Sequence, residues 1–427
     1  MTGATTSADR TQSTAPAGAA PELRLPDSVP RAARPLLRML GRLGHGRLLL
    51  TLPGGETLSF GAGDPAVPLQ LRNWKPLTAA LARGDVGFAE SWIAGDWRCE
   101  RLIDVLDLML ANRGTLEAAI YGNGFARLID RLRHLIRHNS RSGSRRNIEA
   151  HYDLGNAFYR LWLDDTMTYS SALFGGQAEL PLPQAQRAKY GRILDQLGLQ
   201  AGSRVLEIGC GWGGFAEQAA RAGLRLKGLT LSHEQLAFAN QRLADAGLGA
   251  QAGCVLQDYR DEQQRHDGIV SIEMFEAVGE RYWPRYFETL ARCLAPGGRA
   301  VVQTIVIDDR LFDRYRCGTD FIQQFVFPGG MLPSPSGFEA QARRAGLRVL
   351  DRFAFGQDYA RTLAQWRETF MQRLDAVRGQ GFDERFIRTW EFYLAYCEVA
   401  FRHRSTDVIQ FTLGHAGAAG KPAGGAT

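Results

Sequence analysis

The sequence predicts an α/β protein in which a doubly wound, mostly parallel sheet of seven strands follows a smaller N-terminal α+β domain. Short apolar segments alternate with helical segments from about residue 204, and a glycine-rich turn with Gly209, Gly211 and Gly213 follows the first of them. Strands separated by helices are typical of parallel sheets, whose ligands bind at the carboxyl ends of the strands. A chain of 427 residues is long enough for two domains, each with its own core.

Seven segments of the second domain have strand character. Helices are expected at 214–222 and from residue 234, and a turn at Pro296–Gly298 precedes the fifth strand. The expected strands are residues 204–208, 225–230, 253–257, 268–272, 299–305, 347–353 and 406–413.

The N-terminal domain is expected over residues 21–124. Residues 47–60 read as strand, turn and strand, with the turn at Pro53–Gly55, and helical spacing occurs at 77–81 and 102–110. Residues 1–20 and 415–427 are rich in small residues and are expected to be a disordered leader and tail. The second domain is expected over 147–414.

Composition describes an ordinary globular protein with an excess of basic residues. The hydrophobic fraction is 45%, the charged fraction is 22% and the net charge is +6, with a pI near 9.1. An anionic partner is therefore worth considering, although this charge alone does not separate nucleic acid, a membrane surface and simple solubility. No apolar segment has the length of a membrane-spanning helix, and no secretory signal is recognisable.

The six cysteines are scattered, without a C-x-x-C pair or a cluster of metal ligands. This pattern predicts a reducing compartment, the cytoplasm, and neither disulfides nor a metal site.

Residues 125–146 form a basic stretch in which seven arginines are balanced only by Asp130. Leucine and isoleucine supply an apolar side, so the stretch is expected to be a basic amphipathic helix. Such a helix suits the surface of an anionic membrane. A solvated linker helix between the domains explains the same spacing.

The glycine turn indicates a nucleotide-like ligand. Its residues also match the pattern G-x-G-x-x-G, which is typical of dinucleotide-binding sites. A turn with a purely structural role is a further alternative. Glu207, two residues before Gly209, favours a ligand amine or ammonium over a pyrophosphate. S-adenosylmethionine, whose α-amino group and sulfonium are cationic, is therefore the preferred cofactor.

Several motifs in the right order resemble one family. From about residue 147 to 413 the chain is similar to the cyclopropane-fatty-acyl-phospholipid synthases, which are S-adenosylmethionine-dependent methyltransferases. Residues 90–97 resemble the N-terminal lipid-handling domain of that family more weakly. The matching motifs are at 151–156, 166–170, 209–214, 229–235, 327–330 and 401–413.

The resemblance implies which residues hold the cofactor. Tyr169 and Ser170 are expected at its methionine end, and Thr230 and Gln235 at its ribose. Tyr259 and Arg260 are expected beside the adenine. The full expected set is Tyr169, Ser170, Glu207, Gly209, Gly211, Thr230, Gln235, Tyr259 and Arg260.

The resemblance also implies an acceptor site in which bound bicarbonate acts as the base. Its cradle corresponds to Ser171, Glu276, Gln303, Ile305 and Tyr359, and Cys397 corresponds to a cysteine treated as an active-site residue. Ser171 replaces the usual cysteine and Gln303 the usual histidine. Both can donate hydrogen bonds to an anion, but neither titrates near neutral pH as histidine does.

The acceptor reaction needs a dry, aromatic site because methyl transfer to an alkene leaves a carbocation. The aromatic candidates from the sequence are Phe275, Tyr282, Trp283, Phe321 and Phe325.

These expectations describe an enzyme that transfers a methyl or methylene group to the cis double bond of unsaturated phospholipid acyl chains and forms cyclopropane fatty acids. Related enzymes with glutamine at position 303 make methyl- or methylene-branched chains, which is the alternative product. The resemblance implies a cytoplasmic protein associated peripherally with the inner membrane, and a homodimer as one assembly state. Nucleic acid is not an expected partner. A methyltransferase for a soluble small molecule and a non-catalytic lipid-binding protein are the rival readings.

Overall fold

The computed structural model describes residues 25–116 and 154–417. The expected leader (1–20), the basic amphipathic stretch (125–146) and residues 418–427 of the expected tail lie outside these ranges. At the start of that tail, His415 is the last residue of a strand, and Ala416 N donates a hydrogen bond to Gly346 O at 3.0 Å.

The N-terminal unit is built on a four-stranded sheet with the order β2-β1-β3-β4. The predicted hairpin is present as two antiparallel strands, with Leu48 opposite Phe60. Two further strands that the sequence analysis did not identify extend the sheet, one of them parallel to β1. The strands are β1 (Arg47–Thr51), β2 (Thr57–Phe60), β3 (Ala66–Leu71) and β4 (Trp97–Cys99), and the helices are α1 (Arg34–Leu40), α2 (Lys75–Ile93) and α3 (Leu102–Ala111).

The helix α2 contains a sharp kink, and glycines make it possible. Gly84 has φ 62° and ψ −137°, outside the helical region. A Cβ added at Gly87 would lie 2.2 Å from the carbonyl oxygen of Ala79, so the chain folds closely back on itself there. Only a residue without a side chain fits that position.

The larger sheet has seven strands in the order β10-β11-β9-β8-β5-β6-β7. The pairs of β5 with β6 and β8, β6 with β7 and β8 with β9 are parallel, and β11 is antiparallel to both β9 and β10. The predicted mostly parallel, seven-stranded sheet is therefore confirmed. The strands are β5 (Arg204–Ile208), β6 (Arg225–Thr230), β7 (Ala252–Leu256), β8 (His266–Ile272), β9 (Leu294–Ile307), β10 (Leu347–Ala354) and β11 (Thr406–His415).

The fifth strand starts earlier than predicted. Leu294 already pairs with His266, and the register then shifts so that Arg299 pairs with Gly268. The predicted turn at Pro296–Gly298 is thus an irregularity inside β9, where Gly297 has φ 78°.

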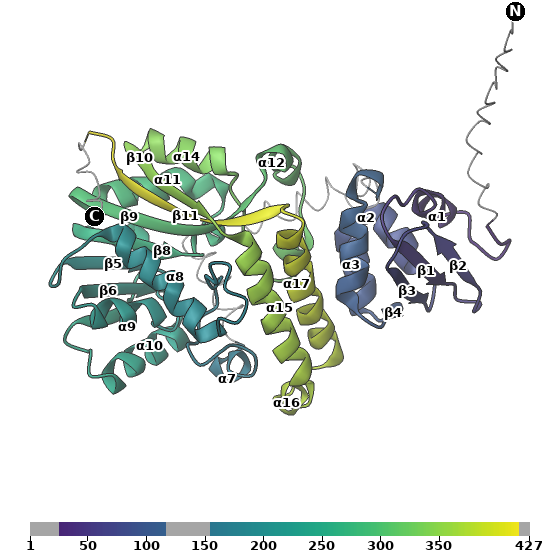
Figure 1. Cartoon of the computed structure of the whole chain (residues 1–427), viewed down its shortest axis with the longest axis horizontal. Coiled ribbons are helices and arrows are strands. Elements are labelled where there is room, and N and C mark those ends of the chain that lie inside the picture. The colour runs from purple at the N-terminus through teal and green to yellow at the C-terminus, as the bar shows by residue number, and fades with distance from the viewer. Residues whose placement is uncertain (1–24, 117–153, 418–427) are drawn as a thin grey trace, which may run out of the picture.

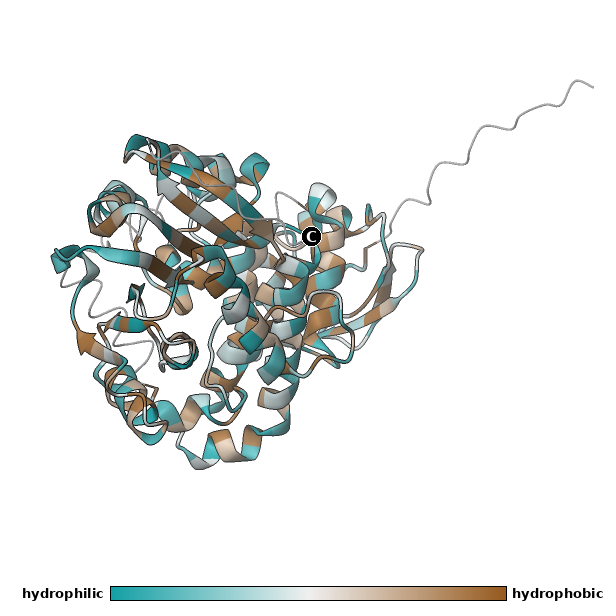
Figure 2. Cartoon of the chain, turned by 60° about the vertical axis from the view of Figure 1, so that its left-hand side comes forward, coloured by the Kyte–Doolittle hydropathy of each residue, from teal (hydrophilic) through white to brown (hydrophobic). Residues whose placement is uncertain are grey.

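Both faces of this sheet are covered by helices, as Figure 1 shows. Successive residues point to opposite faces: Val205 belongs to the core beneath one set of helices and Leu206 to the core beneath the other. In Figure 2, brown hydrophobic segments run along the strands of the larger sheet. The first set is α8 (Leu182–Leu197), α9 (Gly214–Arg221) and α10 (His233–Asp245), and the second set includes α11 (Trp283–Cys293) and α14 (Pro335–Arg344).

Two long helices, α15 (Gly356–Gln372) and α17 (Glu384–Arg402), lie between the larger sheet and the N-terminal unit (Figure 1). Helix α17 packs against α2 and α3. Trp92 Nε1 donates to Arg388 O at 3.2 Å, and Arg388 donates back to Trp92 O at 3.0 Å. One cluster of buried residues contains both Trp97 and Trp366, so the hydrophobic core is continuous across the two expected domains.

The remaining helical segments are short. They are α7 (Asn156–Tyr159), η1 (Tyr259–Asp261), η2 (Phe275–Ala277), η3 (Glu280–Tyr282), α12 (Asp309–Tyr315), α13 (Phe321–Phe325) and α16 (Leu374–Gly379). Among the described residues, no helix has the length and apolar character needed to cross a membrane.

The close approach at Gly87 gives a prediction about stability. Gly87→Ala should lower the midpoint of thermal unfolding, because the methyl group overlaps the Ala79 carbonyl and forces the backbone apart, at a cost of about 1–3 kcal/mol. Circular dichroism melting checks this. Gly54→Ala is the control, since no atom lies within 4 Å of a Cβ there. Equal melting of the two variants would contradict the kinked geometry.

Candidate active site

The glycine turn follows β5 directly and leads into α9. Gly209 and Gly211 have φ of 85° and 50°, values that favour glycine. A Cβ at Gly209 would lie 2.9 Å from Met274 Cγ, whereas a Cβ at Gly211 would meet no atom within 4 Å. The turn is thus packed on one side and open to a pocket on the other.

All nine residues predicted to hold the cofactor line this one pocket. They come from β5 and the turn after it, β6, α10, the segment before α8 and the segment after β7. The empty volume of the pocket, its open mouth included, is about 1160 Å³, ample for a nucleoside-sized ligand.

Glu207 is the most unusual group in the pocket. It is 2% exposed, and its Oε2 has no hydrogen-bond partner among the described residues. Burial raises the pKa of its carboxyl well above the usual range. A buried carboxylate oxygen without a partner fits a cationic ligand amine, as the sequence predicts.

The predicted ribose residues are held by a small network at the start of α10. Thr230 Oγ1 donates to Gln235 Oε1 at 3.0 Å, and the Ser232 side chain caps α10 by accepting from Gln235 N at 3.2 Å. Because Gln235 Oε1 is occupied, its Nε2 is the atom able to donate to a ligand hydroxyl.

The predicted adenine residues form another wall. Arg260 is paired with Asp258 through its Nε at 2.8 Å and through a second guanidinium nitrogen at 2.5 Å. The ring of Tyr259 stands edge-on to Tyr286, with centroids 5.6 Å apart. These contacts leave a mostly neutral, planar wall on that side of the pocket.

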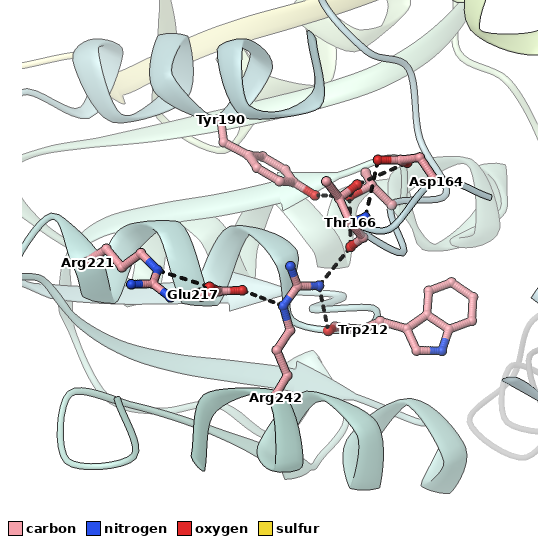
Figure 3. A network of polar contacts seen from close by, with 8 residues as sticks. Asp164, Thr166, Tyr190, Trp212, Glu217, Arg221 and Arg242 are labelled. Atoms are coloured by element: carbon pink, nitrogen blue, oxygen red, sulfur yellow. Dashed lines mark hydrogen bonds and ion pairs between the residues drawn. The ribbon is translucent and has the colours of Figure 1, made fainter. Parts of the chain in front are cut away.

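Arg242 of α10 joins Thr166, three residues before Tyr169, to Glu217 of α9 and to the backbone of Trp212 in the glycine turn (Figure 3). It donates to Thr166 O at 2.7 Å and to Glu217 Oε2 at 2.6 Å. This anchoring brings an upstream segment to the pocket and explains how Tyr169 and Ser170 reach it.

Lys189 is a buried cation beside the pocket that the sequence analysis missed. Its Nζ donates to Ser170 Oγ at 2.6 Å and to Gln186 Oε1 at 2.7 Å. Burial lowers its pKa to about 7, and the carboxylates of Glu273, Asp164 and Glu207 oppose that shift. The signal in the sequence is a lysine on the apolar side of α8, next to Tyr190 and between Ala185 and Ile193.

Three of the five predicted cradle residues meet at Glu273, which the sequence analysis also missed. Ser171 N donates to Glu273 Oε1 at 2.9 Å, and Gln303 Nε2 donates to the same oxygen at 2.7 Å. Tyr359 OH donates to Oε2 at 2.6 Å. Glu273 also lines the cofactor pocket. It could have been found as the first residue after a parallel strand, where ligand-facing side chains gather.

The other two cradle residues contact each other. Glu276 Oε1 accepts from Thr304 Oγ1 at 2.9 Å and from Ile305 N. Its Oε2 has no partner among the described residues. Burial first, and then the charge of Glu273, raise the pKa of Glu276 to about 8.

Cys397 lies on α17. Burial first, and then charges that include one at Cys397, raise the pKa of Tyr359 and of Tyr393. Burial also raises the pKa of the Cys397 thiol well above the usual range, so the thiol remains protonated. The expected active-site role of Cys397 therefore stays a prediction without support from its surroundings.

Aromatic rings surround Tyr169 at the edge of the cofactor pocket. Their centroids lie 5.5 Å (Tyr159), 5.4 Å (Trp162) and 5.5 Å (Trp366) from that of Tyr169. The hydroxyls of Tyr169 and Tyr393 are 2.6 Å apart. We call Tyr159, Trp162, Tyr169, Trp366 and Tyr393 the aromatic cluster.

None of the five aromatic residues predicted from the sequence belongs to the aromatic cluster. Phe275 and Trp283 stack on each other, 5.6 Å apart, in the core beneath α11. Phe321 and Phe325 stack near α17. The ring of Tyr282 lies 5.9 Å from the guanidinium of Arg260, which lines the cofactor pocket. Sequence spacing could not identify the aromatic cluster because α7, the segment between α7 and α8, α15 and α17 contribute its rings from distant positions.

The fold and the pocket define an S-adenosylmethionine-dependent methyltransferase. Residues 139–411 match the family model described as mycolic acid cyclopropane synthetase. The chain belongs to this family.

Relatives and solved structures agree with this assignment. The chain is 40% identical to the tuberculostearic acid methyltransferase UfaA1 of Mycobacterium tuberculosis over 386 residues, 86% of this chain and 88% of the relative. It is 33% identical to the cyclopropane-fatty-acyl-phospholipid synthase of Escherichia coli over 355 residues, 82% and 88% of the two chains.

Two solved structures of cyclopropane synthases each superpose on this structure with a TM-score of 0.59. Each match covers 63% of this chain and 97% of the solved chain. MmaA2 of Mycobacterium tuberculosis is 32% identical, and CmaA1, complexed with S-adenosylhomocysteine and CTAB, is 30% identical. The cofactor is therefore S-adenosylmethionine, and the enzyme modifies lipid acyl chains.

The partnerless oxygen of Glu207 gives a test of the cofactor site. Glu207→Gln should weaken S-adenosylhomocysteine binding about 10- to 100-fold, because a charged hydrogen bond becomes a neutral one. Isothermal titration calorimetry measures this. Glu288→Gln, at an exposed glutamate of α11, should bind like the wild type. Unchanged binding by Glu207→Gln would remove Glu207 from the site.

The raised pKa of Glu276 gives a test of its surroundings. Between its ordinary pKa of 4.5 and about 8, the unfolded chain is ionised at this position while the folded protein keeps the proton. The carboxyl therefore costs stability progressively as pH rises through this window. Glu276→Gln removes the titration, so its melting temperature relative to the wild type should rise from about pH 5 to about pH 8. A difference that is constant with pH would contradict the raised pKa of Glu276.

Proposed function

We propose that this enzyme transfers the methyl group of S-adenosylmethionine to a cis double bond in an unsaturated phospholipid acyl chain, and that the main product is a methyl- or methylene-branched chain. The observation that carries the proposal is the aromatic cluster, which shares Tyr169 with the cofactor pocket. Cations are attracted to aromatic faces. Such a wall suits both a sulfonium and a carbocation on the acceptor.

The cofactor supplies an electrophilic methyl group. The chain's own residues have three tasks in this proposal: Glu207 and Gln235 hold the cofactor, the aromatic cluster excludes water and faces the developing positive charge, and a carboxylate accepts the proton that is lost at the end. Removing that proton from the new methyl group closes a ring. Removing it from the chain, or from the methyl after a hydride shift, leaves an alkene with a branch.

A large apolar pocket supports a long-chain lipid as substrate. It lies at the junction of the N-terminal unit with the larger domain, has an empty volume of about 1780 Å³ with its open mouth included, and is lined chiefly by leucines such as Leu50, Leu69 and Leu106. Arg83, Arg113 and Arg314 contribute to its walls. Apolar walls with nearby arginines suit an acyl chain that carries an anionic head group. We assign the lipid-handling role of the N-terminal unit to this pocket.

The relatives support a branched product. The relative with 40% identity is named for tuberculostearic acid, whereas the cyclopropane synthase of Escherichia coli is 33% identical. Gln303 supports the same product, because the family resemblance implies that glutamine at this position is typical of enzymes that make branched chains. Cyclopropane formation is the second candidate, favoured by the family model. Peripheral membrane association and a homodimer belong to the same proposal.

Lipid analysis tests the product. Fatty acid methyl esters from cells that express the enzyme and contain oleate should gain the mass of one CH₂ group and still react with dimethyl disulfide, which adds to alkenes. A product of the same mass that does not react would mean a cyclopropane ring. Cells expressing Glu207→Gln are the control and should accumulate much less product. The proposed function would be contradicted if fatty acids stayed unmodified in cells that express the wild-type enzyme while the purified enzyme still bound the cofactor.

A further inference from the structure

Glu273 occupies the place that the family resemblance assigns to bicarbonate. Ser171, Gln303 and Tyr359 were expected to donate hydrogen bonds to that ion. In the structure they donate to the two oxygens of Glu273 instead, at 2.9, 2.7 and 2.6 Å. Bicarbonate and a glutamate side chain both present a planar carboxylate, so these donors serve either group. With Glu273 in place, these three donors are already occupied by a carboxylate of the protein.

The backbone holds Glu273 in this place at an energetic cost. Glu273 has φ 49°, a left-handed conformation that is uncommon for residues other than glycine. Its own N–H donates to Gln303 O at 2.8 Å, which ties it to β9. Backbone strain of this kind persists where surrounding contacts hold the residue in place, and it is common at functional sites.

The orientation of the Gln303 amide is determined by a chain of hydrogen bonds across the sheet. Gln303 Oε1 accepts from Gln410 Nε2 at 3.0 Å, and Gln410 Oε1 accepts from Arg192 at 2.7 Å. Arg192 in turn pairs with Asp351 at 2.6 Å. Gln303 must therefore turn its Nε2 toward Glu273, where it donates to a carboxylate. Both glutamines are fully buried.

The side chain at position 171 takes no part in this contact. Ser171 binds Glu273 through its backbone N–H, and its hydroxyl donates to Ala172 O at 3.0 Å. The replacement of cysteine by serine therefore does not alter this contact, in which the Glu273 carboxylate takes all three donors.

We propose that the Glu273 carboxylate is the base of this enzyme and replaces bicarbonate. This inference rests on the proposed function. The alkene electron pair forms the new bond to the methyl carbon, and the bond from that carbon to sulfur breaks, with its electrons remaining on sulfur. A C–H bond of the resulting carbocation then breaks. Its electrons form the final carbon–carbon bond, and its proton goes to a Glu273 oxygen.

The first experiment measures turnover in buffer freed of carbon dioxide. Vesicles of dioleoylphosphatidylglycerol are the acceptor and S-adenosylhomocysteine release is the readout. Wild-type turnover should change by less than about twofold when bicarbonate is added. Turnover by Glu273→Gly should fall at least about 100-fold, because glycine suits the positive φ but removes the carboxylate. Added bicarbonate or formate should restore part of the turnover of Glu273→Gly. Neither ion should restore turnover in Glu273→Gln, because the glutamine amide still occupies the place of the carboxylate.

Two results would overturn the proposal: wild-type turnover that requires bicarbonate, or Glu273→Gly that remains active without it. Circular dichroism melting should show a cooperative folded state in all three proteins, which separates loss of the base from loss of folding.

A second experiment does not depend on turnover. Line broadening of ¹³C-labelled bicarbonate in NMR spectra should reveal binding to Glu273→Gly and not to the wild type. Equal binding by both proteins would contradict the occupied cradle. Absence of turnover by wild type on every unsaturated lipid would instead contradict the proposed function, and this binding comparison would still decide the place of Glu273.

Discussion

Two carboxylates at the carboxyl ends of neighbouring parallel strands are the constraint around which this active site is arranged. Glu207 is the second-last residue of β5. Glu273 directly follows β8, the parallel strand that pairs with β5. A buried carboxylate is costly unless it is hydrogen-bonded or paired with a cation. Glu273 is satisfied by the protein, through donors from three separate segments. Glu207 keeps one oxygen without a partner among the described residues, and a cationic cofactor suits it. These different surroundings are the basis for proposing Glu207 as a cofactor-binding residue and Glu273 as the base.

The helices α15 and α17 connect this site to the N-terminal unit. Tyr359 of α15 donates to Glu273, and the hydroxyl of Tyr393 of α17 contacts that of Tyr169. The same helix α17 is bound to α2 through Arg388 and Trp92. The hydrophobic core continues across this junction, and α17 contributes to both the apolar pocket and the aromatic cluster. A lipid chain held in the pocket would therefore lie against the same helix that carries Tyr393 of the aromatic cluster.

Two side chains define the acceptor site in our proposal. A histidine in place of Gln303 would titrate near neutral pH, whereas the amide keeps a fixed donor whose direction Gln410 determines. The Glu273 carboxylate, directly after β8, accepts from the donors that the resemblance assigns to bicarbonate. In the proposed mechanism Gln303 and Glu273, more than Ser171, determine which group is the base.

The sequence by itself determined the parallel sheet and the cofactor pocket, because both depend on local patterns: apolar segments of strand length, and glycines directly after the first of them. Glu207, Gly209 and Gly211 belong to one turn, so their proximity needed no knowledge of distant contacts. Only the tertiary structure decided the acceptor site. Glu273 meets Gln303 and Tyr359 from separate strands and helices, and the buried lysine beside the pocket, Lys189, comes from yet another helix. Hydrogen bonds between segments far apart in the chain leave no periodic signal, so the family resemblance named the three donors, Ser171, Gln303 and Tyr359, but not the carboxylate that they surround.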